Sequence, residues 1–200
     1  MAKQKLLLVD GHALAFRAFY ALPELNAPDG TPTNAVLGFV NMLLKVLNDE
    51  KPTHVAVVFD AKGETFRHQA YREYKAGRPP APDAFKVQLP LIKELVALLG
   101  LPLLEIEGVE ADDVIASAAL RAASSGVEAS ILTADKDLMQ ILAPGIRVIR
   151  PSKGVSDFKV YDAETFTEEY GFPPRAFVDY LALVGDKVDN VPGVPGIGDK

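Results

Sequence analysis

The sequence contains no cysteine and only three histidines among its 200 residues. This excludes disulfide bonds and thiolate metal sites, and it fits a reducing compartment. No apolar run approaches the length that crosses a membrane. The N-terminal MAKQKLLLVDGH has two lysines and a short apolar run, but Asp10 interrupts it before a signal-peptide core is complete. We therefore expect a soluble cytoplasmic protein with no membrane partner.

A basic excess, which nucleic-acid-binding proteins usually show, is also lacking. The formal net charge is −6, from 27 Asp and Glu against 21 Lys and Arg. If the nine acids identified below are metal ligands, the remaining 18 leave a balance of +3. The acidity is then concentrated at one site, and the net charge no longer argues against a polyanionic partner.

With 48% hydrophobic residues, the chain can form one sizeable core, or a core with a small appendage. Its apolar segments predict buried strands at 5–10, 53–60, 101–108 and 128–135, and helices at about 11–22, 34–48, 83–99, 110–123 and 137–141. Two further strands, at 146–151 and 158–162, are expected at the sheet edge. The alternation predicts an α/β fold with a mostly parallel central sheet flanked by helices.

Three predicted strands end in aspartate, at Asp10, Asp60 and Asp135. Ligands bind at the carboxyl edge of an open parallel sheet, and neighbouring strands lie about 4.8 Å apart, so these side chains are within reach of one ion. More acids lie at the starts of two predicted helices and in the segment GDKVDN. They are Asp137, Glu110, Asp112, Asp113, Asp186 and Asp189.

Each acid taken alone is also explained as a helix cap or first-turn residue, worth about 0.3–1 kcal/mol. Capping explains the set poorly, because it gives no reason for successive strands to end in aspartate. Clustered carboxylates without cations would raise one another's pKa values. Oxygen ligands suit Mg²⁺ or Mn²⁺ rather than zinc, and this many carboxylates exceed what one ion can use. The acids therefore predict two ions and phosphodiester chemistry.

The segment 62–82, KGETFRHQAYREYKAGRPPAP, is polar and carries five Lys or Arg against two Glu, so it predicts an excursion from the sheet. Its cations are interleaved with aromatic residues, which suits the phosphates and stacked bases of a single strand. They are Arg67, Arg72, Lys75 and Arg78, with Phe66, Tyr71 and Tyr74. The alternative is a solvated helical face whose aromatic residues enter the core. The position directly after Asp60 favours the functional interpretation.

The tail VPGVPGIGDK has glycines that let a backbone turn sharply and expose N–H groups, as phosphate-binding hairpins do: Gly193, Gly196 and Gly198. It is not a nucleotide-binding P-loop, because no strand precedes it and the Gly-Lys-Ser/Thr ending is missing. An ordinary loop is the alternative.

Together these motifs resemble the 5′-nuclease (flap endonuclease) superfamily, and within it the N-terminal 5′→3′ exonuclease domains of bacterial DNA polymerases I. The resemblance rests on LLLVDGHALAFRAFYAL, VVFDAKGETFRHQAYREYKAGR, GVEADDVIA, LTADKDLMQIL and GDKVDNVPGVPGIGDK, in family order along essentially the whole chain. It implies a PIN-like fold with a catalytic domain over 1–180 and a helical arch at about 62–82. It also implies that 181–200 begin a helix-hairpin-helix, truncated at Lys200.

The resemblance also implies residue roles. Five acids match one side of a two-metal cluster of Mg²⁺ or Mn²⁺, namely Asp10, Asp60, Glu110, Asp112 and Asp113. The other side matches Asp135, Asp137, Asp186 and Asp189. Lys75 and Arg78 match arch residues that position the scissile phosphate and stabilise its charge, and Phe16 and Arg17 match the gateway near the unpaired end nucleotide. A K⁺ ion is expected at the helix-hairpin-helix.

The implied activity is hydrolysis of phosphodiesters near the single-strand/duplex junction of a 5′ DNA flap, in a DNA polymerase I that removes primers and acts in repair. We expect a monomer in the bacterial cytoplasm, associated with the nucleoid, with polymerase domains in the full-length chain. The truncated duplex-binding region predicts weak DNA binding. Because cations activate water and stabilise both reacting oxygens, His12, His54 and His68 are expected to be structural or surface residues.

Two other functions stay open. A PIN-like ribonuclease shares the carboxylate-ended sheet but leaves the basic segment and the Gly-Pro tail unexplained; a preference for structureless RNA would favour it. The second is a DNA-junction binding module that is stabilised by metal and has no turnover. Substrate that survives saturating Mg²⁺ or Mn²⁺ would favour this binding module.

Overall fold

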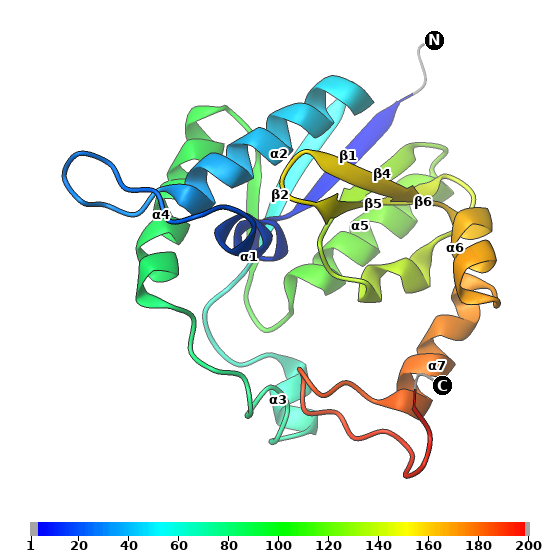
Figure 1. Cartoon of the computed structure of the whole chain (residues 1–200). Coiled ribbons are helices and arrows are strands. Elements are labelled where there is room, and N and C mark those ends of the chain that lie inside the picture. Colours follow the sequence, from blue (N-terminus) through cyan, green and yellow to red (C-terminus); the bar gives the residue numbers. More distant parts are fainter. Residues whose placement is uncertain (1–3, 199–200) are drawn as a thin grey trace.

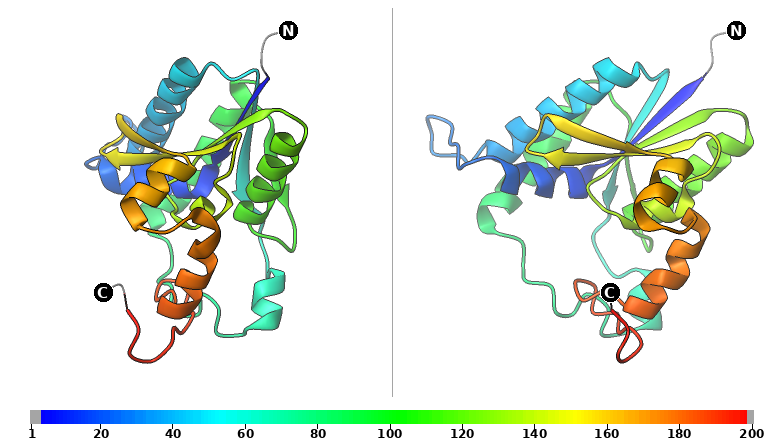
Figure 2. Two further views of the ribbon diagram at one scale, coloured as in Figure 1. Left: turned by 90° about the vertical axis from the view of Figure 1, so that its right-hand side faces the viewer. Right: turned by 45° about the vertical axis from the view of Figure 1, so that its right-hand side comes forward.

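The structure, a computed structural model, describes residues 4–198. Lys200, where we expect the duplex-binding region to be cut, lies outside the described residues. A six-stranded sheet in the order β3-β2-β1-β4-β5-β6 forms the centre, and helices cover both of its faces (Figures 1 and 2). All neighbouring strands are parallel except β5 and β6, which are antiparallel. The predicted α/β fold with a mostly parallel sheet is confirmed.

The strands are β1 Lys5–Asp10, β2 His54–Asp60, β3 Leu103–Ile106, β4 Glu128–Leu132, β5 Ile146–Lys153 and β6 Asp157–Tyr161. The α-helices are α1 Gly11–Ala21, α2 Asn34–Glu50, α3 Phe66–Ala70, α4 Asp83–Leu98, α5 Ala111–Ser124, α6 Ala163–Tyr170 and α7 Phe177–Val184. Two 3₁₀ helices are η1 Asp137–Ile141 and η2 Pro174–Ala176. In this part of the chain, no helix combines the length and apolar character needed to cross a membrane.

The central strand β1 contributes side chains to two apolar clusters, one on each face of the sheet. Leu7 and Val9 pack with residues of α1, α2 and α4, whereas Leu8 packs with residues of α5 and β4. Alternate residues of a strand point to opposite faces, so a strand buried on both faces has to be apolar throughout. Strand order reverses between β1 and β4, and this is the position where α/β sheets bind ligands.

Two predictions about strand position are wrong. The segment 101–108 is not a buried strand, because β3 has only four residues, lies at the sheet edge and exposes Glu105 and Ile106. The segment at 146–151 is not an edge strand, because β5 lies between β4 and β6. Its Val148 and Ile149 are buried from opposite faces. Strand order depends on pairing between distant segments, which apolar composition alone does not encode.

The predicted arch leaves the carboxyl end of β2 and returns at α4, as expected, but little of it is helical. Within 62–82 the α-helix is limited to the five residues of α3, and residues 71–82 form turns and irregular backbone. Lys75 has a left-handed φ of 59°, and the prolines that follow cannot extend a helix. The described tail after α7 is also irregular, so the start of a helix-hairpin-helix is not confirmed.

Candidate active site

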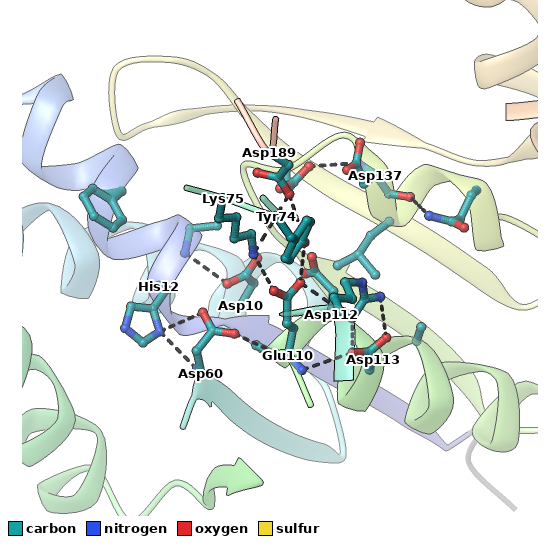
Figure 3. Close-up of a pocket in the computed structure, with 18 of the residues that line it drawn as sticks. Asp10, His12, Asp60, Tyr74, Lys75, Glu110, Asp112, Asp113, Asp137 and Asp189 are labelled. Carbon is teal, nitrogen blue, oxygen red and sulfur yellow. Dashed lines mark hydrogen bonds and ion pairs between the residues drawn. The ribbon is translucent and has the colours of Figure 1, made fainter. Parts of the chain in front are cut away.

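A cavity of about 340 Å³ lies at the carboxyl ends of β1 and β2, facing the segment 67–78 (Figure 3). Eight of the nine predicted acids line it: Asp10, Asp60, Glu110, Asp112, Asp113, Asp135, Asp137 and Asp189. The ninth, Asp186, lies outside the lining. Its carboxylate accepts hydrogen bonds from the backbone N–H groups of Val188 at 2.7 Å and Asp189 at 3.1 Å, so it holds the turn that carries Asp189.

Asp10 is both the last residue of β1 and the N-cap of α1. One carboxylate oxygen accepts the Ala13 N–H at 3.0 Å and the other accepts the Thr133 hydroxyl at 2.8 Å. The same Thr133 oxygen accepts the Asp135 N–H at 2.9 Å. Thr133 is fully buried and joins Asp10 at the end of β1 to Asp135, which lies in the loop after β4 and not at the end of the strand as predicted; Thr133 was not among the predicted site residues. In the sequence, the only hint of this role is that Thr133 is a hydroxyl residue between the buried strand and Asp135.

The acids at the start of α5 combine capping with cavity lining. Asp60 accepts the Ala111 N–H at 2.8 Å, and Asp113 accepts the Glu110 N–H at 3.1 Å. Negative charge at a helix N-terminus is favourable because the free N–H groups are concentrated there. The helix end therefore helps to fix these carboxylates at the wall of the cavity.

Burial and mutual repulsion make the acids hard to ionise together. The pKa of Asp112 is raised to about 8, first by burial and then by Asp10, Asp135 and Asp60. Burial also raises the pKa of Asp10 to about 6 and, together with neighbouring acids, that of Asp137 to about 6. One buried oxygen of Asp137 has no hydrogen-bond partner. At neutral pH Asp112 is therefore mostly protonated unless a compensating cation lies nearby.

Three of the predicted cations reach the acids directly. Lys75 Nζ lies 2.6 Å from Glu110 Oε1, and Arg67 donates two hydrogen bonds to Asp113 at 2.6 and 2.8 Å. The hydrogen bonds from Arg67 lower the pKa of Asp113 below its usual value. Arg78 donates to the carboxylate of Asp189. The segment 67–78 thus supplies positive charge to one side of the cavity, as its position after β2 predicts.

Tyr74 is buried among these groups rather than exposed for base stacking. Its hydroxyl lies 3.0 Å from a carboxylate oxygen of both Glu110 and Asp189 (Figure 3). Burial, followed by these two acids, raises the pKa of the phenol, so Tyr74 is a neutral hydrogen-bond donor to one of them at a time.

The other predicted DNA contacts differ in their distance from the cavity. Phe16 lines it and stacks on Phe85, with ring centroids 3.9 Å apart. Arg17 lines an adjoining shallow cavity and donates to the Ser152 carbonyl at 3.2 Å. Arg72 and the tail glycines Gly193, Gly196 and Gly198 are not brought to the acids. Gly193 instead approaches α7, because a Cβ there would lie 2.4 Å from the Val184 backbone.

His12 is the one predicted structural histidine at the cavity. Its Nδ1 accepts the Asp60 N–H at 3.1 Å, and its ring meets Phe59 edge-on. Burial lowers the pKa of His12, so the neutral ring that accepts this bond is favoured. His12 thereby supports the backbone that carries Asp60.

Within residues 4–198, no three Asp, Glu or His side chains are arranged closely enough to hold a metal ion. Lys75, Arg67 and Arg78 pair with three of the cavity acids in this arrangement. The donor set itself consists of carboxylate oxygens, which are the ligands that hard divalent cations prefer. Several of these acids have raised pKa values and one buried oxygen of Asp137 has no hydrogen-bond partner, so a bound cation would compensate both.

A parallel sheet that gathers acids at its switch point, beneath a cationic segment, defines a class of α/β proteins typical of phosphodiester-cleaving enzymes. The family comparison agrees with this class. The chain belongs to the family described as 5′-3′ exonuclease, N-terminal resolvase-like domain, whose sequence model matches residues 5–171. The resemblance found in the sequence is confirmed.

Relatives in this family include DNA polymerases and a separate exonuclease. The chain is 47% identical over 198 residues to DNA polymerase I of Bacillus caldotenax. The aligned region covers 99% of this chain and 23% of the polymerase. It is 46% identical over 195 residues to a 5′-3′ exonuclease of Aquifex aeolicus, covering 98% of this chain and 66% of that protein. The chain therefore spans about a quarter of the polymerase and under two thirds of the exonuclease.

Solved structures support the fold. The bacteriophage T5 5′-exonuclease with bound divalent metal ions (zinc) superposes with a TM-score of 0.77 at 23% identity, over 98% of this chain and 72% of the phage chain. A flap endonuclease of bacteriophage T5, in a complex with DNA and metal ions, gives a TM-score of 0.76 at 22% identity over the same shares. At this level of identity the likeness establishes a shared fold.

Proposed function

We propose that this chain is a divalent-metal-dependent 5′ nuclease that hydrolyses phosphodiesters at the single-strand/duplex junction of 5′ DNA flaps. In the longer protein it would act beside polymerase domains, in primer removal and repair. The observation that carries the proposal is the set of eight acids in one cavity at the sheet switch point, with Lys75, Arg67 and Arg78 at its side.

Two groups of acids would hold the ions. The first consists of Asp10, Asp60, Glu110, Asp112 and Asp113. The second consists of Asp135, Asp137 and Asp189, with Asp186, whose carboxylate lies outside the cavity lining and holds the turn that carries Asp189, as the fourth predicted member. Bound Mg²⁺ or Mn²⁺ would supply Lewis-acid activation of water and stabilisation of the reacting oxygens. The K⁺ expected at the tail glycines stays a prediction, as does the division of the chain near residue 180.

The chain's own side chains would bind and orient the substrate. Lys75 and Arg78, now paired with Glu110 and Asp189, are free to transfer their hydrogen bonds to a phosphate that enters between them and the acids. Thr133 fixes the Asp10 side chain and the Asp135 backbone relative to each other through its hydroxyl group. His12 fixes the Asp60 backbone by accepting its N–H. These supports keep the carboxylates in place when the cations move.

Cleavage of a 5′-labelled flap tests the proposal. With Mg²⁺ we expect one main product, cut near the junction, and a downstream strand with a 5′-phosphate. Asp112→Asn should remove most of the cleavage, because a neutral amide supplies less charge at the centre of the acids, while circular dichroism and flap binding stay close to wild type. Leu98→Ala, at an exposed position on α4, is the matched control.

Three results would contradict the proposal. Faster cleavage of structureless RNA than of flapped DNA would favour the ribonuclease. Intact substrate at saturating Mg²⁺ and Mn²⁺, with binding retained, would favour a binding module without turnover. Wild-type rates from Asp112→Asn would place the reaction elsewhere on the protein.

A further inference from the structure

Two acids of the second group lie beyond the end of β4. Asp135 is in the loop that follows the strand, and Asp137 is the first residue of η1. Backbone pairing with β5 reaches Thr133, whose N–H donates to the Ile149 carbonyl at 3.1 Å. In a parallel pair the next bond would need the N–H of Pro151, and proline has none. The sheet alone therefore does not hold the chain that carries these acids.

A side chain of β5 takes over where this pairing stops. Arg150 donates from Nη2 to the Ala134 carbonyl at 2.9 Å. That carbonyl belongs to the same peptide group as the Asp135 N–H, which donates to the Thr133 hydroxyl at 2.9 Å. Because a peptide group is planar, two bonds on its opposite sides fix its orientation, and with it the direction in which the Asp135 side chain leaves the backbone.

The effect passes from Asp135 to the next acid. One carboxylate oxygen of Asp135 accepts the Asp137 N–H at 2.9 Å, so a shift of the first acid would displace the start of η1 as well. Ala134 and Asp135 also line the shallow cavity beside Arg17. The peptide group that Arg150 holds therefore sets the place of two predicted cation ligands.

Arg150 is committed to this contact. Its side chain is partly buried, and its Nε is buried without a hydrogen-bond partner within residues 4–198. Burying part of a guanidinium costs free energy unless every donor is paired. An apolar side chain would fill the same space without that cost, so the charged donor is explained by the loop that it holds.

We infer that Arg150 is a positioning residue for the second group of acids: it orients Asp135, and through it Asp137, for binding a divalent cation. The inference rests on the proposed function, in which these acids hold an ion. Arg150 does not line the acidic cavity, so it acts through the loop and not on the substrate. Loss of a residue that orients a metal ligand in this way changes metal affinity about 10–100-fold.

A second arginine of β5 provides the matched control. The Arg147 guanidinium donates to the Glu50 carboxylate and to the Ser130 hydroxyl, and Arg147 does not line the acidic cavity. Loss of this partly buried ion pair should destabilise the fold at least as much as loss of the Arg150 contact. It should leave the cation affinity unchanged, because neither of its partners belongs to the loop that carries Asp135.

Manganese binding measures the role without any cleavage. Free Mn²⁺ is followed by electron paramagnetic resonance while the ion is titrated into the full chain. Arg150→Met keeps the length and the apolar stem of the side chain but removes its donors, and it should weaken Mn²⁺ binding at the second group about tenfold. Arg150→Lys keeps one charged donor group and should lose only about threefold, half the free energy of a tenfold change. Arg147→Met should lower the melting temperature but bind Mn²⁺ like the wild type.

Double variants locate the effect. In Asp135→Asn the second group is already impaired, so adding Arg150→Met should cause no further loss of Mn²⁺ affinity. In Asp60→Asn, which alters the first group, the loss of about tenfold should persist. With all acids intact, Arg150→Met should raise the Mg²⁺ concentration for half-maximal flap cleavage about tenfold, while flap affinity and the rate at saturating Mg²⁺ stay close to wild type.

Wild-type Mn²⁺ affinity in Arg150→Met, with a lowered melting temperature, would overturn the inference, because Arg150 would then be structural only. An equal loss in the Asp135→Asn and Asp60→Asn backgrounds would overturn it as well. If Arg150→Met does not fold, wild-type affinity in Arg150→Lys is the contradicting result. If the wild-type protein binds Mn²⁺ with these dependences but cuts no flap, the proposed function fails and the positioning role stands. If it binds no Mn²⁺, both fail.

Discussion

At the residue scale, Thr133 shows how one buried hydroxyl can organise a cluster of acids. It donates to Asp10 and accepts from the Asp135 backbone, so it links the end of β1 to the loop that follows β4. Neither contact is suggested by the sequence, in which a threonine after a buried strand is unremarkable. Asp10, Asp60 and Asp135 were predictable because each follows an apolar run, and the structure brings eight of the nine predicted acids to one cavity.

Thr133→Val tests this link. The change keeps the shape of the side chain but removes both hydrogen bonds and leaves the Asp135 N–H unsatisfied, so we expect a loss of about 1–3 kcal/mol in the free energy of unfolding. Flap cleavage under single-turnover conditions should slow as well, because Asp10 and Asp135 lose their common support. Urea denaturation and a cleavage assay measure the two effects. Thr133→Ser, which keeps the hydroxyl, should stay near wild type, and equal behaviour of Val and Ser variants would refute the role.

At the element scale, the segment 73–78 is attached to the loop after α7. The Lys75 N–H donates to the Asp189 carbonyl at 2.9 Å, and the Asn190 side chain donates to the Glu73 carbonyl at 2.8 Å. Lys75 and Asn190 both have left-handed φ angles, of 59° and 58°, which hold the two turns against each other. The loop and the arch therefore form one unit around the acids.

Asn190→Asp should loosen that unit. The carboxylate keeps the left-handed backbone accessible but removes the N–H donor, so a lost bond of about 1 kcal/mol should speed hydrogen exchange of the Lys75 amide about fivefold. Exchange measured by NMR gives the result, with Asn41→Asp, at an exposed position on α2, as the control. Unchanged exchange in Asn190→Asp would mean that other contacts hold the arch.

The elements also show what the sequence could and could not predict. Strands β1, β2 and β4 and helices α1, α2, α4 and α5 follow from local apolar patterns, and the acids follow from where those patterns stop. The edge position of β3, the inner position of β5 and the contact of Tyr74 with Asp189 depend on segments far apart in sequence. The short α3 departs from the expected helical arch because the extended backbone at Tyr71 ends the helix. The left-handed Lys75 and the prolines after it then prevent another helix from forming.

At the scale of the whole molecule, the acids are distributed unevenly. The chain carries a net charge of −6, and eight acids share one cavity, where burial and repulsion raise several pKa values. The folded protein therefore holds protons that the unfolded chain releases, and this makes its stability depend on pH and on cations.

The direction of that dependence can be worked out. Asp112 has a folded pKa of about 8, against 3.8 for an ordinary aspartate, so the stability it contributes is present below about pH 4 and is lost as pH rises to 8. Asp10 and Asp137, with pKa values of about 6, act in the same direction at lower pH. Asp113 acts in the opposite direction because its pKa is lowered. The stability it contributes is lost only in acid, as pH falls below the ordinary aspartate value of 3.8. The lowered pKa of His12 opposes the trend below its ordinary value of 6.5.

Thermal denaturation in EDTA at pH 5 and pH 8 measures the balance. We expect the wild-type protein to be less stable at pH 8 by a few kcal/mol, and Asp112→Asn to remove much of the difference, since it lacks the group with the largest shift. The contribution of His12 is common to both proteins and cancels in the comparison. Mg²⁺ should restore wild-type stability more at pH 8 than at pH 5, because ligands bind the ion in their ionised form. Identical pH dependence in the two proteins, or equal stabilisation by Mg²⁺ in both at pH 8, would show that Asp112 does not lie at the centre of a cation site.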